Sequence, residues 1–319
     1  MKLAVALSLA FLNSGVILSA SAGETAGAIW VKGAWASASD SVTALPEGGK
    51  QIGAVYRNKY FGFAYTASPG WTELFEGPPP SDTGYYVLAQ LEPAVPTQKS
   101  NRGHLMISAQ DMFFTMSTSN NAIELLSYAK DHLDSDFKVE RAPTAVRIAN
   151  HTFIRFDYAS VVSGLHWHVL ATDIRCHVVQ FVFTGRGDLL PAHLVQDMNG
   201  LRLSTEAGHA PVCIKDYARG ENLIAQEDPI FSEPRFNSVP VRITVDTQGR
   251  VSHIHFLSAF PDQVKSISDA LSHWRFKPYF LNGQPVEVET GILFGRPVGR
   301  TAQVLGSLVV AGGPDRRKL

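Results

Sequence analysis

Hydrophobic and polar residues alternate with a period of two in residues 154–158, 167–171 and 179–183, which is typical of half-buried β-strands. Hydrophobic residues recur at helical spacing in residues 121–133 and 188–203, so these segments are predicted to be amphipathic helices. Further strand candidates are residues 60–65, 85–91 and 105–108. Neighbouring strands with short links form antiparallel sheets, and the pattern therefore predicts such a sheet with helices packed on it.

A second patterned block occupies residues 236–297. Residues 241–245 and 251–257 alternate as two strands, joined by a turn in which Gly249 can take a positive φ. A helix follows, because apolar residues recur on one helical face. These residues are Val264, Ile267, Leu271 and Trp274. Their spacing predicts that Trp274 packs in the core and does not bind a ligand.

Residues 276–294 form the last predicted element, a hairpin around Asn282 and Gly283. Asn-Gly between two extended runs is a strong hairpin signal. In the last strand Glu287 and Glu289 alternate with hydrophobic residues, which predicts that one face of this strand is in contact with water. The second block therefore has the order β-β-α-β-β.

Glycine and proline accumulate between the two blocks, which predicts a linker there. The expected fold class is α+β, with two domains: an N-terminal antiparallel sheet with packed helices and the C-terminal β-β-α-β-β block. The predicted segments are a signal peptide (1–22), a flexible lead-in (23–55), the first domain (56–205), the linker (206–235), the second domain (236–297) and a flexible tail (298–319).

The N-terminal segment has the pattern of a cleaved secretory signal. Lys2 precedes a mostly apolar run that ends at Leu18, and small residues follow up to Ala22, where cleavage is predicted. The run is shorter than the roughly 20 residues of a membrane span, so we expect no span in the mature chain. This predicts an exported protein, and in a Gram-negative bacterium the exported location is the periplasm. An uncleaved N-terminus that anchors the chain is the alternative.

Composition narrows the class of partner. Hydrophobic residues make up 45% of the chain and charged residues 18%, as in globular proteins. The formal net charge is −1, which gives no cationic excess to neutralise phosphates, so nucleic-acid binding is not expected.

The chain has two cysteines, Cys176 and Cys213. In an oxidising compartment they could pair in a disulfide, and the alternative is two separate thiols with Cys176 buried. The sequence alone leaves both possibilities open, because it does not give the distance between the two Cα atoms.

Motifs for catalysis are absent from the sequence: it contains no Gly-x-Ser-x-Gly, His-Glu-x-x-His or phosphate-binding Gly-x-x-x-x-Gly-Lys. We expect no enzyme activity and no cofactor. Two His-x-His pairs, His166/His168 and His253/His255, each place two imidazoles on one strand face. No third ligand has a recognisable spacing, so no metal site is predicted. A metal-binding or small-molecule-binding N-terminal domain remains an alternative.

The first block contains YRNKYFGF at Tyr56–Phe63, Pro-Gly-Trp at Pro69–Trp71 and Phe-Asp-Tyr at Phe156–Tyr158. In these motifs it resembles PsbP-like α/β/α sandwich domains. It covers about 150 residues and implies a fold without a particular chemistry. Domains of this type often serve as binding or assembly modules.

The second block contains VDTQGRV at Val245–Val251, WRFKPY at Trp274–Tyr279 and LNGQPVEV at Leu281–Val288. In these residues it resembles the C-terminal domain of the TonB family of periplasmic energy transducers. Residues Leu223–Ile224 and Pro229–Phe231 match the lead-in of that domain more loosely. In the family this domain meets outer-membrane transporters, and an extended partner segment adds to an exposed sheet edge.

The resemblance implies a non-enzymatic protein that binds an extended partner segment at a sheet edge, with an outer-membrane transporter as the expected partner. Family members keep an N-terminal membrane helix and a proline-rich spacer, whereas this chain has a cleavable-looking signal and a folded domain. An anchored energy transducer is therefore the alternative role. The residues assigned to the partner-binding edge are Val286, Val288, Thr290, Ile292 and Phe294.

Overall fold

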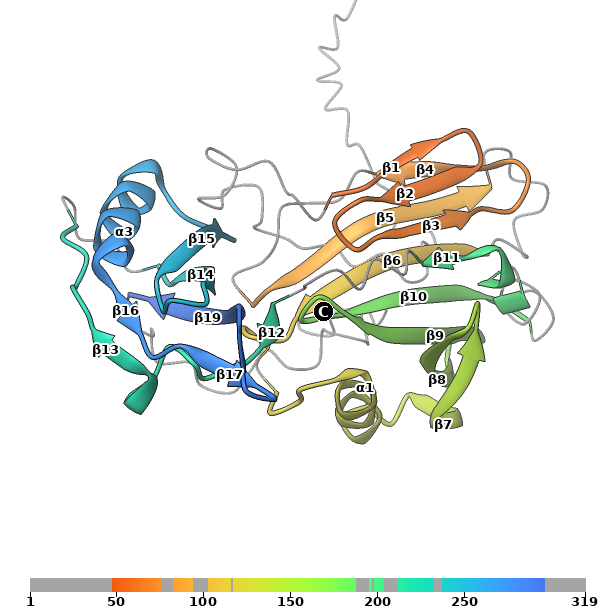
Figure 1. The fold of residues 1–319 in the computed structure, drawn as a ribbon. Helices are drawn as coiled ribbons and strands as arrows, with labels where there is room; N and C mark the ends of the chain where they lie inside the picture. The colour runs from red at the N-terminus through yellow and green to blue at the C-terminus, as the bar shows by residue number, and fades with distance from the viewer. Residues whose placement is uncertain are drawn as a thin grey trace, which may run out of the picture.

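The computed structural model describes residues 48–75, 83–93, 103–115, 117–187, 195–196, 198–203, 211–231 and 237–295. These residues build an N-terminal lobe (48–203) and a C-terminal lobe (211–295), which lie side by side (Figure 1). Each lobe combines β-sheet with an α-helix among its described residues, so the α+β fold class is confirmed.

The N-terminal lobe is built on a seven-stranded antiparallel sheet with the strand order β4-β5-β6-β10-β9-β8-β7. Strands β8, β9 and β10 follow one another in both sequence and sheet, as the period-two pattern predicts. The strands are β4 (Trp71–Phe75), β5 (Tyr85–Pro93), β6 (His104–Asp111), β7 (Phe137–Ile148), β8 (His151–Ser160), β9 (Leu165–Ile174) and β10 (His177–Arg186).

Helix α1 (Ala122–Asp131) covers one face of this sheet (Figure 1). Asn121 caps the helix, since its side chain accepts a hydrogen bond from the Glu124 backbone N–H. The buried face of α1, which includes Leu125 and Leu126, packs with aromatic residues of β8 and β9. This arrangement follows from the apolar stripe of the helix and the alternation of the strands.

A small antiparallel sheet, with the order β1-β2-β3-β11, lies on the opposite face of the large sheet (Figure 1). Its aromatic residues, such as Tyr56 and Phe63, form one buried cluster with Phe181 and Phe183 of β10. The large sheet is therefore covered on both faces. The strands of the small sheet are β1 (Lys50–Ile52), β2 (Val55–Asn58), β3 (Phe63–Thr66) and β11 (Arg202–Leu203), with the 3₁₀ turn η3 (Met198–Gly200) before β11.

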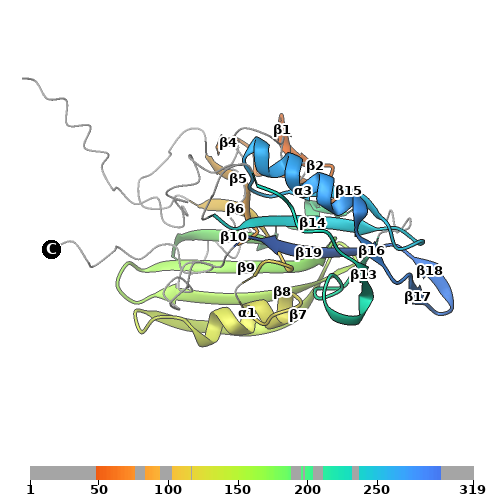
Figure 2. The same ribbon diagram turned by 90° about the vertical axis from the view of Figure 1, so that its left-hand side faces the viewer.

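The C-terminal lobe contains a four-stranded sheet with the order β12-β19-β14-β15. Helix α3 (Pro261–His273) lies across one face of this sheet, as Figure 2 shows. Alternate residues of the strands, including Val241 and Ile243, form one buried cluster with Ile267 and Leu271 of the helix. The strands are β12 (Val212–Cys213), β14 (Val239–Val245), β15 (Val251–Phe256) and β19 (Val288–Phe294).

Two short strand pairs complete the C-terminal lobe: β13 with β16, and β17 with β18. The predicted strand at 276–281 is divided, because Pro278 lacks the backbone N–H that a ladder requires. Trp274 is buried as expected, and its indole N–H donates to the Glu227 carbonyl oxygen at 2.8 Å. The elements are β13 (Leu223–Ala225), β16 (Arg275–Phe276), β17 (Tyr279–Leu281), β18 (Gln284–Val286) and the 3₁₀ turn η4 (Gly220–Asn222).

The structure differs from the sequence-based expectation in two segments. The described end of the predicted helix 188–203 is a 3₁₀ turn followed by β11, because Leu203 pairs with Phe63 in the small sheet. Residues 211–231, expected to be linker, hold β12, η4 and β13. The predicted signal peptide, most of the lead-in and the tail lie outside the described residues. Among the helices that the structure describes, none is long and apolar enough to cross a membrane.

The turn between β14 and β15 makes direct backbone contact with β16. Gly249 has a φ of +78°, and its carbonyl oxygen accepts a hydrogen bond from the Phe276 N–H at 2.8 Å. A Cβ atom at position 249 would overlap the Phe276 carbonyl oxygen. The close approach explains why a glycine occupies this position.

We expect Gly249→Ala to lower the free energy of unfolding by at least about 2 kcal/mol, because left-handed strain and overpacking add. Gly283→Ala is the matched control: Gly283 also has a φ of +78°, but no heavy atom lies within 4 Å of the place that a Cβ atom would take there. We expect the control to lose only about 1 kcal/mol. Urea unfolding of the two variants measures the difference, and equal losses would contradict the contact.

Candidate functional site at the junction of the lobes

Arg242 of β14 crosses from the C-terminal lobe into the N-terminal lobe. Its side chain is 3% exposed, and its Nε lies 3.3 Å from Oδ2 of Asp111, at the end of β6. Its Nη1 lies 3.5 Å from Oε1 of Glu289 and donates a hydrogen bond to the Tyr60 hydroxyl. Its Nη2 donates to the Tyr86 hydroxyl at 3.4 Å. One buried guanidinium thus contacts two carboxylates and two phenols, three of these four groups belonging to the other lobe.

Two histidines flank this arginine. The His177 imidazole is fully buried, with Nδ1 donating to the Arg175 carbonyl oxygen and Nε2 lying 3.6 Å from Oδ2 of Asp111. Burial, together with the charge of Arg242, lowers the pKa of His177 well below its usual value. The same two causes lower the pKa of His255 to about 3. Both imidazoles are therefore neutral in the folded protein at neutral pH.

A disulfide between Cys176 and Cys213 joins the two lobes, with 5.5 Å between the Cα atoms. Cys176 lies in the tight turn between β9 and β10, where it and Arg175 both have a positive φ. The guanidinium of Arg175 lies 5.3 Å from the centroid of the Tyr60 ring. The sulfur of Cys176 lies 3.2 Å from Oε2 of Glu289. This is a packing contact, because a disulfide sulfur carries no hydrogen to donate.

The face of the C-terminal sheet opposite α3 is packed against the N-terminal lobe. Glu289 and Gly291 belong to this face of β19; the Glu289 side chain is 15% exposed, and Gly291 lies directly against the side chain of Phe113. The prediction that this face is in contact with water is therefore corrected for Glu289. The alternation of Glu289 with buried residues is as predicted, but its side chain faces Cys176 and Arg242 at the junction and not open water.

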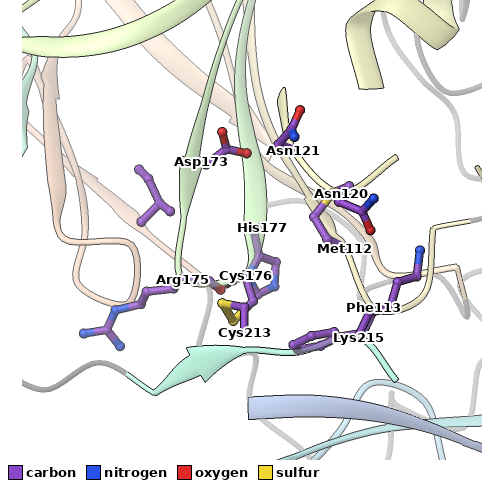
Figure 3. Close-up of a pocket in the computed structure, with 11 residues that line it drawn as sticks. Met112, Phe113, Asn120, Asn121, Asp173, Arg175, Cys176, His177, Cys213 and Lys215 are labelled. Atoms are coloured by element: carbon purple, nitrogen blue, oxygen red, sulfur yellow. Dashed lines mark hydrogen bonds between the residues drawn. A yellow bond between two sulfur atoms is a disulfide. The ribbon is translucent and has the colours of Figure 1, made fainter. Parts of the chain in front are cut away.

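A pocket of about 410 Å³ opens beside this junction (Figure 3). Its walls come from the segment after β6, from the turn between β9 and β10, and from residues 213–215 that lead into the C-terminal lobe. The disulfide lies in its wall. Figure 3 shows that residues from both lobes surround it. Both cysteines predicted as a possible pair thus lie where the lobes meet, beside this pocket and the charged cluster around Arg242.

The buried imidazole of His255 makes stability depend on pH in a defined direction. Because its pKa is lowered, the unfolded chain binds a proton between about pH 6.5 and 3 that the folded chain does not, so stability falls as the pH is lowered through this range. We expect His255→Gln to reduce this fall by about one proton and by roughly 1–3 kcal/mol at pH 4.5. Urea unfolding at several pH values measures it. The same slope in both proteins would show that His255 is charged in the folded state.

Of the five residues predicted to form the partner-binding edge, Val286 ends β18 (Gln284–Val286) and the other four lie on β19. Val288, Thr290 and Phe294 are buried, and Val286 and Ile292 are partly buried. Val288, Ile292 and Phe294 belong to the cluster that packs under α3, and the Thr290 hydroxyl donates to the Lys215 carbonyl oxygen at 3.2 Å. The side chains of Val288, Thr290, Ile292 and Phe294 are therefore directed into the lobe.

Strand β19 is also not a border of its sheet. Residues 212–214 pair with its first half: the Val212 N–H donates to the Glu287 carbonyl oxygen at 2.8 Å, and the Ile214 N–H donates to the Glu289 carbonyl oxygen at 3.0 Å. The reason is that the predicted linker, held in place by Cys213, occupies this edge. The first half of the predicted edge is thus filled by the chain itself.

Strand β15 forms the other border of the four-stranded sheet. The Leu257 N–H donates to the Pro240 carbonyl oxygen at 3.0 Å, which fixes the alternation of hydrogen-bonded pairs along β14 and β15. It follows that the main-chain groups of Ile254 are directed away from β14, toward the border. Ser252 and His253 are exposed, whereas Phe256 is buried. The accessible part of this border is therefore residues 251–254.

The two His-x-His pairs have different surroundings. His166 Nδ1 lies 3.1 Å from Oε2 of Glu140, and His168 Nδ1 lies 3.0 Å from Oδ1 of Asp157. Of the second pair, His255 belongs to the junction and His253 is exposed. Across the described ranges, no three His, Cys, Asp or Glu side chains come together as a group that could hold a metal ion.

Arg242 is the residue that sequence reasoning missed. It stands between Val241 and Ile243 in a strand, which predicts only that it faces away from the core. A signal was available: Arg242, His255 and Glu289 fall on the same face of three predicted strands, and a face with charges of both signs can be an interface.

No protein-family model matches the chain. No curated protein matches its sequence. The structure is similar to the solution structure of cyanobacterial PsbP (CyanoP) from Synechocystis sp. PCC 6803, with 14% identity and a TM-score of 0.35, covering 51% of this chain and 99% of that chain.

Two further solved structures are similar in architecture. One is LpqN of Mycobacterium tuberculosis, a protein involved in cell envelope biogenesis, with 11% identity, a TM-score of 0.29 and coverage of 43% of this chain and 78% of that chain. The other is a crystal structure from Bacteroides thetaiotaomicron VPI-5482, with 10% identity, a TM-score of 0.26 and coverage of 47% and 48%. Because these values are low, function is inferred from the residues of this chain.

Proposed function

We propose that this chain is an exported, non-enzymatic interaction protein of the TonB family type that binds an extended partner segment by strand addition. The proposed partner is an outer-membrane transporter. The observation that carries the proposal is the border formed by β15, where the main-chain groups of Ile254 are directed away from the sheet. Main-chain hydrogen bonds at such a border are the source of affinity in strand addition.

The proposal moves the binding edge from β19 to β15. Residues 212–214 occupy the first half of the β19 edge, and Phe113 packs on Gly291 further along that strand. At β15 the exposed side chains are those of Ser252 and His253, which are small or polar. A partner would therefore be held mainly by its backbone, over a segment of about four residues, and its affinity would be modest.

The junction of the lobes supports this role by holding the border in place. Arg242, on the strand next to β15, is fixed by Asp111 and Glu289, and the disulfide adds a covalent link. A rigid border loses less conformational entropy when a partner strand adds to it. The N-terminal lobe thus acts in the proposal as a support for the binding lobe.

Export of the chain is the second part of the proposal. It is supported by the signal-like pattern that ends at Ala22 and by the disulfide, since disulfides persist in oxidising compartments such as the periplasm. N-terminal sequencing of the protein recovered from the periplasm is expected to begin at Gly23. A mature chain that begins at Met1 or Lys2 would favour the alternative role, an anchored energy transducer.

Site-specific photocrosslinking tests the binding edge. A photoreactive amino acid is placed at Ser252 on β15, or at Lys265 on the exposed face of α3 as the matched control; the Lys265 side chain is 79% exposed. The probes are synthetic peptides with the sequences of the periplasmic N-terminal segments of outer-membrane transporters from the source bacterium. We expect crosslinks at Ser252 and none at Lys265. Equal yields at both positions, or no crosslink with any peptide, would reject the proposal.

A further inference from the structure

The pocket at the junction has the size of a ligand site. Its volume of about 410 Å³ falls in the range of roughly 300–1,000 Å³ in which proteins bind small molecules. Residues of both lobes line it, and Cys213 in its wall belongs to β12, the border of the C-terminal sheet opposite to β15. A ligand here would contact both lobes without touching the strand border.

Lys215 is a cation of this pocket that makes no direct ion pair within the described residues, although the charges of Asp216 and Asp111 favour its protonated form. It is half-buried, and burial lowers the pKa of its ammonium group. Its backbone carbonyl accepts a hydrogen bond from Thr290, but within the described part of the chain its side chain makes no hydrogen bond or ion pair. A half-buried ammonium group that makes no direct ion pair can pair with the negative group of a ligand.

The other polar groups of the pocket are already engaged. Oδ1 of Asp173 accepts a hydrogen bond from the Ala122 N–H at 2.8 Å, and burial raises the pKa of this carboxyl group. The side-chain amide of Asn120 donates to the Thr118 carbonyl oxygen and to Glu124. The guanidinium of Arg175 lies over the Tyr60 ring. Arg175 is thus engaged by Tyr60, and Lys215 is the cation of the pocket that an anionic ligand would contact.

The rest of the wall is apolar. Met112, Phe113 and Ile174 line the pocket together with the disulfide. Figure 3 shows Met112, Phe113 and Lys215 close together on one side of the pocket. A ligand that is complementary to Lys215 and to these apolar residues has one negative group and an apolar body. We infer that this pocket binds a small organic monocarboxylate, whose carboxylate pairs with Lys215 and whose apolar part lies against Met112 and Phe113.

Isothermal titration calorimetry with hexanoate and phenylacetate tests this inference on the full mature chain. Hexanamide is the neutral probe of matched length. Lys215→Met removes the charge and keeps the length of the side chain, and Lys138→Met, at an exposed lysine of β7, is the control. We expect at least one carboxylate to bind, with affinity at least tenfold lower for Lys215→Met, unchanged for Lys138→Met, and at least tenfold lower for hexanamide.

Equal affinity for the wild type and Lys215→Met, equal affinity for hexanoate and hexanamide, or no heat with either carboxylate would overturn the inference. A second measurement does not depend on the variant folding. In wild-type protein with ¹³C-labelled methionine methyl groups, the Met112 signal is expected to shift on addition of the bound carboxylate. A shift confined to other methionines would place the ligand elsewhere. Neither result bears on strand addition at β15, so the two proposals fail separately.

Discussion

Arg242→Met is expected to lower the free energy of unfolding by about 3–5 kcal/mol, the usual cost of removing one partner of a buried ion pair. The loss arises because Asp111 and Glu289 would remain in the junction without their shared cation, while the phenol of Tyr60 would lose its donor. Methionine retains much of the volume of the aliphatic chain, so the effect reports the charge more than a cavity. Urea unfolding at pH 7 measures it.

A matched control is Arg219→Met, because Arg219 is also paired with an aspartate but its side chain is 77% exposed. We expect a change below about 0.5 kcal/mol for this variant. Combining Arg242→Met with Asp111→Asn should restore part of the loss, since the double variant leaves one buried carboxylate fewer without a cation. Additive losses in the double variant would show that Arg242 and Asp111 do not interact.

Replacing both cysteines, Cys176→Ser with Cys213→Ser, is expected to cost about 4 kcal/mol. The 37-residue separation between the two cysteines sets this figure through the loop-closure entropy that the disulfide removes from the unfolded chain. The double replacement avoids a single reactive thiol. Urea unfolding under non-reducing conditions measures the loss.

The disulfide also predicts where the effect appears in the folded protein. Residues 212–214, which include Cys213, pair with the edge of β19. Their amides should therefore exchange with solvent faster in the variant, whereas amides in the middle of β9 should exchange at the same rate as in the wild type. Uniform faster exchange throughout both lobes would instead indicate a general loss of stability. Unchanged exchange at residues 212–214 would show that pairing with β19 holds them without the disulfide.

Much of the fold follows from the local pattern of the sequence. The alternation in residues 154–158 and 179–183 gave strands that lie in one sheet, and the apolar stripe of α3 lies in the core as its spacing requires. These features depend on neighbours within one element, and periodicity reports them directly. Periodicity did not predict the structure at Pro278 or at Leu203. Pro278 has no backbone N–H, and the predicted strand is divided there. Leu203 pairs with Phe63, which is far away in sequence, and is therefore in a strand and not in a helix.

The functional surfaces were harder to predict, because they depend on what covers each face and edge. Period two correctly placed Arg242 and Glu289 on the face opposite the core of their own lobe. It could not show that the N-terminal lobe covers this face, nor that residues 212–214 fill the edge of β19. Both facts arise from contacts between segments more than 70 residues apart. The pattern of hydrophobic and polar residues within a single element does not predict such contacts.

The two sides of the C-terminal sheet have different roles in the proposal: one face is covered at the junction, and the border formed by β15 is accessible. The charged face of the C-terminal sheet holds the lobes together, and β15, a border of that sheet, is the strand at which we propose that a partner adds. A partner that competed for the β19 edge would first have to displace residues 212–214, which the disulfide anchors. Strand addition at β15 requires no such displacement.

Amide hydrogen exchange at Ile254 tests strand addition most directly. In the wild-type chain, labelled with ¹⁵N, the account predicts that a bound transporter peptide slows exchange of the Ile254 N–H, because this group gains a main-chain acceptor on the partner. Exchange at Ile243, in the middle of the sheet, should not change. Binding that leaves Ile254 unprotected, or that protects amides of β19 instead, would contradict the account.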